Sequence, residues 1–120
     1  MTMDEPLRRQ KSSLLARNRE AVKAAEPFND AVASWQPQLA RLRVLANRSG
    51  KSPDQRSELS EEAEMLARQI HDQQLAFSAA LQLMPPEVAT HGRIADTHKA
   101  MNSASAGVEV ILALLAAPQS

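Results

Sequence analysis

The sequence predicts an all-α protein: an antiparallel three-helix up-down-up bundle with a long, kinked first helix. Composition is the first observation behind this, because the 120 residues include only 3 Gly and 2% aromatic residues and are rich in the strong helix formers Ala, Leu, Gln, Arg and Glu. Apolar residues also recur every three, four or seven positions, as on one face of a helix. Two short connections, at 48–51 and 85–86, predict antiparallel neighbours.

The first helix is expected over residues 5–47 because a seven-residue apolar repeat extends through this range. Its members are Leu7, Leu14, Ala21, Phe28, Trp35 and Leu42, with a companion set at Ala25, Val32, Leu39 and Ala46. Such positions resemble the a and d sites of a coiled coil, and they are consistently apolar only from Ala21 onward. Pro27 and Pro37 interrupt the range, yet the repeat keeps its phase across both, which favours one kinked helix. The alternative is a break at Pro27, which makes the protein a four-helix bundle.

The second helix is expected over residues 53–84. Ser52 is a good N-cap, Pro53 suits the first helical position, and Gln55 completes a capping box. A single apolar stripe follows, formed by Leu59, Ala63, Leu66, Ile70, Phe77, Leu81 and Met84. Pro85 and Pro86 end the helix, and a third helix is expected over residues 86–117.

The third helix has its own apolar repeat at Ile94, Met101, Val108 and Leu115, with His98, Ser105 and Leu112 four residues on from the first three. Small and polar residues fill its middle, 102–107, which indicates either close packing of a neighbouring helix or a segment that orders on binding. We favour close packing. Residues 108–115 are apolar on nearly every side, which is typical of a central helix or of a surface that binds a partner.

Charge is unevenly distributed in a chain with a formal net charge of zero. Residues 1–51 contain ten Lys or Arg and five Asp or Glu, whereas residues 52–84 contain two and six. The simplest interpretation is a basic first helix beside an acidic second helix. The first helix also exceeds the other two by about 15–20 Å at 1.5 Å per residue, so its N-terminal end lacks a neighbour within the chain.

Catalytic and metal-binding patterns are weak. His71 and Asp72 are adjacent on a helix and point about 100° apart, so they cannot orient one another. Glu87, His91 and His98 share a predicted face, but no Glu-x-x-His pair accompanies them, and we interpret both histidines as partly buried residues of the seam. Glutamates early in the second helix fit the helix dipole. We therefore expect no enzyme, no cofactor and no metal.

The absence of cysteine excludes disulfides and thiolate metal sites. Residues 1–10 lack the apolar core of a signal peptide, and the longest apolar run, 110–117, is too short to span a bilayer. The expected location is the cytoplasm.

The predicted function is a helical protein–protein interaction module, an adaptor, chaperone-like or regulatory protein whose partner is another protein or a second copy of itself. Small bacterial helical adaptors and secretion chaperones are similar in general build, which is an analogy of architecture. The expected partner-binding residues lie at the unpaired end of the first helix and at the apolar C-terminal end: Leu7, Arg8, Arg9, Leu14, Val110, Leu114 and Leu115. The alternative is a nucleic-acid-associated regulator that uses the basic N-terminal helix.

Overall fold

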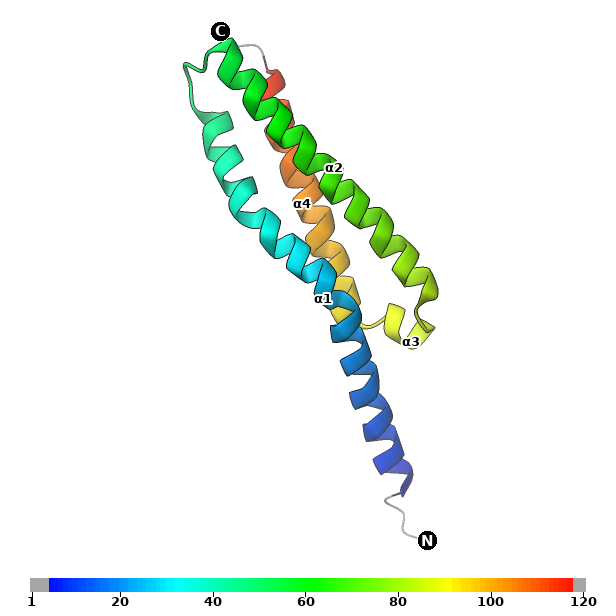
Figure 1. Cartoon of the computed structure of the whole chain (residues 1–120). Coiled ribbons are helices and arrows are strands. Elements are labelled where there is room, and N and C mark those ends of the chain that lie inside the picture. Colours follow the sequence, from blue (N-terminus) through cyan, green and yellow to red (C-terminus); the bar gives the residue numbers. More distant parts are fainter. Residues whose placement is uncertain (1–4, 118–120) are drawn as a thin grey trace.

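The computed structural model describes the backbone of residues 5–117 and the side chains from residue 14 to residue 117. Within this part the chain is entirely helical apart from short connections, so the all-α expectation is confirmed. Helix α1 spans Glu5–Asn47, α2 spans Pro53–Leu83, α3 spans Pro86–Ala89 and α4 spans Gly92–Ala116. The three long helices lie side by side, and α1 extends past the others at its N-terminal end (Figure 1).

Helix α1 is continuous through both internal prolines, so a break at Pro27 is not observed. A proline lacks the N–H that would bond the carbonyl four residues earlier, here Lys23 for Pro27 and Ala33 for Pro37. All four residues are exposed, so water can hydrate the two carbonyls left without a backbone donor. The solvent-facing position of the prolines therefore explains how the helix continues, with the curvature visible in Figure 1.

Helix α2 begins at the capping box expected from the sequence. The Gln55 N–H donates to Ser52 Oγ over 3.2 Å, and the Ser52 N–H donates to Gln55 Oε1 over 3.0 Å. Pro53 occupies the first helical position, where its missing N–H removes no hydrogen bond. The expected stripe faces inward, with Ala63, Leu66, Ile70 and Phe77 buried.

The last third of the chain differs from the single helix expected over residues 86–117. A turn at Thr90 and His91 separates α3 from α4. His91 is the N-cap of α4, because its backbone is extended and its Nδ1 accepts the Arg93 N–H over 3.1 Å. The weak helix former Gly92 disfavours a continuous helix at this point, and the His91 cap stabilises the start of α4. Val88 is buried and holds the short α3 in the core.

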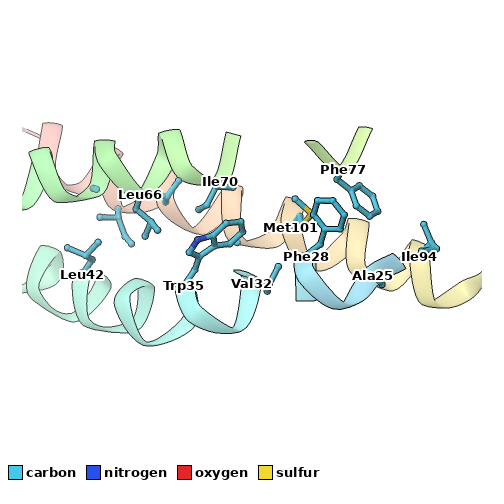
Figure 2. Close-up of a cluster of buried hydrophobic side chains, with 14 of the residues drawn as sticks. Ala25, Phe28, Val32, Trp35, Leu42, Leu66, Ile70, Phe77, Ile94 and Met101 are labelled. Carbon is cyan, nitrogen blue, oxygen red and sulfur yellow. The ribbon is translucent and has the colours of Figure 1, made fainter. Parts of the chain in front are cut away.

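One hydrophobic core joins α1, α2 and α4 (Figure 2). Phe28 and Phe77 meet edge to face with ring centroids 5.0 Å apart, a favourable aromatic geometry. Trp35 is also buried, as a residue of the structural core, and lies near Ile70 (Figure 2). The α1 side of the core begins at Ala21 and continues along the predicted repeat, comprising Ala21, Ala25, Phe28, Val32, Trp35, Leu42 and Ala46.

The buried face of α4 is wider than the face predicted from its apolar repeat and is rotated about the helix axis relative to it. Ile94, Met101, Val108 and Leu115 are buried as expected. The second buried row lies three residues on, at Thr97, Ala104 and Ile111, whereas His98 is exposed and Ser105 and Leu112 are only half-buried. Because α4 packs more extensively on α1 than on α2, its buried surface turns toward α1.

The small residues of α4 pack closely against α1, which is the interpretation favoured from the sequence. Ala104 is buried, and a Cβ added at Gly107 would lie 3.8 Å from Leu39 Cδ2. Thr97 Oγ1 donates to Asn29 Oδ1 over 2.9 Å across the same interface. The segment 102–107 is therefore a part of α4 that packs against α1.

Candidate interaction surface

The unpaired end of α1 is the clearest candidate surface. Leu14 continues the buried row of Ala21 and Phe28 at seven-residue spacing, yet its side chain is 55% exposed, and the adjacent Leu15 is 60% exposed. Among the described side chains of α1, Ala21 is the first that is fully buried, and α1 extends past α2 and α4 at its N-terminal end (Figure 1). Residues 14–20 thus present an apolar face that no other described residue of the chain covers. We call this segment the overhang.

Leu7, Arg8 and Arg9, the other expected binding residues of this end, have helical backbones, but their side chains lie outside the described residues. In the overhang and the turn after it, the described charges are Arg17, Arg19 and Lys23, all exposed, against Glu20. The surface next to Leu14 and Leu15 is therefore basic.

The apolar C-terminal end is divided between core and surface. Leu115 is only 5% exposed and packs in the core of the chain, which corrects the expectation that it binds a partner. Leu114 is half-buried and Val110 is 46% exposed. Three of the predicted contact residues at this end therefore have three different environments, because only one side of α4 faces its neighbours.

Val110 lies one turn beyond Gly107, beside a groove between α1 and α4. The groove has a volume of about 370 Å³. Its lining is mostly small or apolar: Gln36, Leu39, Ala40, Arg43, Ser103, Ala104, Gly107 and Ile111. This groove and the exposed Val110 beside it offer an accessible apolar surface at this end.

A second groove of about 500 Å³ lies where α1, the loop and the start of α2 meet. Two of the three cations that line it are engaged within the chain: Arg41 forms an ion pair with Glu62, and Lys51 Nζ donates to the carbonyls of Ala46, at 2.9 Å, and Arg48. These contacts satisfy the C-terminal end of α1. We interpret this groove as a structural junction.

The outer face of α2 was missed by the sequence reasoning. Met65, Leu75 and Leu83 are 59%, 58% and 87% exposed, and Ala76 and Ala79 lie exposed among them. The sequence did contain a signal for this face, because Met65, Leu75 and Leu83 do not belong to the apolar stripe of α2. Packing in the core does not explain apolar residues on the opposite side of a helix.

The histidines do not form a site. His91 caps α4, while His98 is an exposed residue of α4 whose ring contacts Phe77 at a centroid distance of 5.6 Å. The expectation of a partly buried residue is therefore wrong for His98, whereas His91 is half-buried and hydrogen-bonded. His71 is exposed on α2. Within the described part of the chain, no group of three or more His, Cys, Asp or Glu side chains gathers in a way that could hold a metal ion.

One described helix, α4, is long and apolar enough by length and composition to cross a membrane. Of its most apolar 18-residue window, 28% is buried. A core helix of a soluble bundle meets the same criterion, and here Ile94, Met101, Val108 and Leu115 pack against neighbouring helices. The criterion alone is weak support for a membrane span.

No family model, no curated protein and no solved structure matches this chain.

Proposed function

We propose that this protein is a non-enzymatic, cytoplasmic protein–protein interaction module that binds its partner through helical apolar surface. The proposal treats the fold as an antiparallel three-helix up-down-up bundle. The side-by-side long helices and the short connections at 48–52 and 84–85 support that arrangement (Figure 1). In such a bundle, helical faces that extend beyond the common core are available for another molecule.

The exposure of Leu14 is the observation that carries the proposal. Leu14 lies on the face of α1 that is buried from Ala21 onward, but the other helices end before they reach it. An isolated apolar helical segment of this kind is marginal in water. A partner that packs along the overhang would continue the core by two further turns.

The groove between α1 and α4 supplies a second accessible surface at the other end of the bundle. The small residues Ala40, Ser103 and Gly107 are part of its lining, and Val110 lies beside it. Small residues permit the backbone of a partner helix to approach closely. This surface supports the proposal, since both ends of the bundle offer helical apolar contacts.

Binding of nucleic acid is less well supported than binding of protein. The exposed Arg17, Arg19 and Lys23 could contact phosphates. However, the three aromatic residues of the chain, Phe28, Trp35 and Phe77, are all buried in the core, so none is available to stack on bases. The basic overhang lacks the second feature that single-stranded nucleic-acid binders use.

The test is the mass of the native complex with two matched variants of the overhang. Leu14→Glu places a charge on the apolar face, and Ala16→Glu places the same charge two residues later, on the opposite side of the helix at about 100° per residue. We expect the wild-type protein to purify as an assembly heavier than its 13.1 kDa chain. Leu14→Glu should dissociate that assembly and Ala16→Glu should preserve it, as measured by light scattering after size-exclusion chromatography.

The proposal fails if the protein is a 13.1 kDa monomer with nothing bound. It also fails as a statement about the overhang if both variants keep the assembly intact.

A further inference from the structure

We infer that the partner is a second copy of this chain, docked antiparallel along the outer face of α2, so that each overhang lies beside the acidic start of α2 in the other copy. The inference rests on the proposed function and names its partner. It follows from the accessible surface of the chain, from the apolar residues on α2 and from the separation of charge along the bundle.

The surface of the chain is too large for a compact monomer. Its accessible area is 8455 Å², whereas a folded monomer of 13.1 kDa exposes about 6,400 Å². The radius of gyration is 20.3 Å, against about 14 Å expected for a compact domain of 120 residues. The excess of about 2,000 Å² in one chain is larger than the roughly 800 Å² that each partner buries in a standard stable interface.

The outer face of α2 provides the apolar centre of such an interface. Met65, Leu75 and Leu83 are the exposed large side chains there, and Ala76 and Ala79 lie between them. Leu75, Ala76, Ala79 and Leu83 form an apolar cluster on which two copies of this face can pack in antiparallel fashion, and the exposed Arg68, Gln69 and Asp72 separate that cluster from Met65. A two-fold axis near Leu75 would bury the same patch on both copies, which is the most common form of homodimer.

Charge along the molecule is separated in a way that suits the same arrangement. The overhang and its following turn carry the exposed cations Arg17, Arg19 and Lys23. The start of α2 carries the exposed anions Asp54, Glu58, Glu61 and Glu64. Of the neighbouring acidic residues, Glu62 is already paired with Arg41.

These opposite charges cannot meet within one chain. The ion pair of Arg41 with Glu62 places the acidic start of α2 at the level of Arg41. Arg17 lies 24 residues earlier on the same helix, which is about 36 Å along its axis. An electrostatic contact between them therefore requires a second molecule.

The two-fold axis near Leu75 brings the charges together. The stacking of Phe28 on Phe77 places Leu75 at the level of about residue 30 of α1. Arg17 then lies about thirteen residues beyond that level in one direction, and Glu64 lies eleven residues beyond it in the other. Because a two-fold axis exchanges the two directions, Arg17 of one copy comes to the level of Glu64 in its partner, to within about one helical turn.

A reciprocal charge exchange tests this arrangement. One variant carries Arg17→Glu, and the other carries Glu64→Arg, since Arg19 points to the opposite side of the helix from Arg17 at about 100° per residue. In a dimer of either variant alone, like charges face each other at both contacts. In a dimer formed by one copy of each variant, opposite charges face each other at both contacts. We expect the wild type to have twice the mass of the 13.1 kDa chain, each variant alone to dissociate at least tenfold more readily, and the equimolar mixture to recover wild-type affinity to within about threefold.

Glu109→Arg is the matched control, since Glu109 is exposed on α4 away from these surfaces; it should leave the dimer intact. Leu75→Glu removes the apolar centre and should give a folded monomer, with the helical circular dichroism of the wild type. Sedimentation equilibrium measures all of these masses.

The outcomes separate the inference from the function on which it rests. Variants that remain dimeric alone, or a mixture that stays monomeric, overturn the antiparallel arrangement. A monomeric wild type that binds a different protein, with binding lost in Leu14→Glu, overturns the second copy as partner and leaves the interaction function standing. A monomeric wild type that binds nothing overturns both.

Discussion

Two glycines of this chain have opposite roles in the backbone. Gly50, in the loop between α1 and α2, has a φ of +78°, a left-handed conformation that residues with a Cβ adopt at a cost. Gly107 lies inside α4, where a glycine lowers helix stability relative to alanine. Space exists for a Cβ at both positions, with nothing within 4 Å at Gly50 and only Leu39 Cδ2, at 3.8 Å, near Gly107. Backbone conformation alone should therefore decide the effect of substitution.

We predict opposite effects for the same substitution at these two positions. Gly107→Ala should raise the free energy of unfolding by about 0.5–1 kcal/mol, because alanine favours the helix and restricts the unfolded chain. Gly50→Ala should lower it by about 1–2 kcal/mol, because the left-handed conformation strains a residue with a Cβ. Urea denaturation followed by circular dichroism measures both values. A loss of stability in Gly107→Ala would show that α1 and α4 are packed more tightly there than the 3.8 Å contact indicates.

At the scale of elements, the helices differ in how their ends and interruptions are stabilised. Helix α2 has a complete capping box at Ser52 and Gln55, and α4 begins at a histidine cap. Helix α1 instead contains two interior prolines. Packing along the rest of the helix offsets their unfavourable effect on helix stability. From Ala21 to Ala46 its inner face is buried in every turn, which explains why α1 stays a single helix despite both prolines.

The cost of an interior proline can be measured at Pro27. An interior proline is about 3 kcal/mol less favourable than alanine in a helix, while it stabilises by up to about 1 kcal/mol through the unfolded chain. Pro27→Ala should therefore raise the free energy of unfolding by about 2 kcal/mol. Pro53→Ala is the matched control, because Pro53 occupies the first position of α2, and it should change stability by less than about 0.5 kcal/mol. If Pro27→Ala destabilises the protein, the bend at Pro27 is required for packing of the bundle.

At the scale of the whole molecule, the shape is a rod with principal extents of 78 × 22 × 18 Å. The common core of α1, α2 and α4 occupies the part beyond Ala21, and the overhang extends from one end (Figure 1). The residues that stabilise the fold therefore lie in the common core, and the proposed contacts with a partner lie in the overhang. Changes in the overhang should consequently affect association without affecting folding.

Removal of residues 1–19 tests this separation. Residues 14–19 contribute no buried side chain, so the shortened chain should unfold within about 0.5 kcal/mol of the full chain when both are measured at concentrations where they are monomeric. Its association should be lost at the higher concentrations at which the full chain assembles. A large loss of stability in the monomer would mean that the N-terminal segment is part of the folding unit.

The first two long helices, and most of the buried faces of all three, could be predicted from the sequence. The repeat from Ala21 to Ala46, the stripe of α2 and the capping box at Ser52 depend on the spacing of neighbours along one chain, and local spacing can be read directly. The predicted row of α4 at Ile94, Met101, Val108 and Leu115 is buried for the same reason.

Only the tertiary structure decided which apolar residues are covered. Leu14 and Leu115 both lie on apolar repeats, yet one is 55% exposed and the other 5% exposed, because a second helix reaches the level of Leu115 and none reaches Leu14. The turn at His91 and the rotation of α4 toward α1 were likewise not evident from the sequence pattern. Burial depends on where another element ends in space, and periodicity within one helix carries no information about that distance.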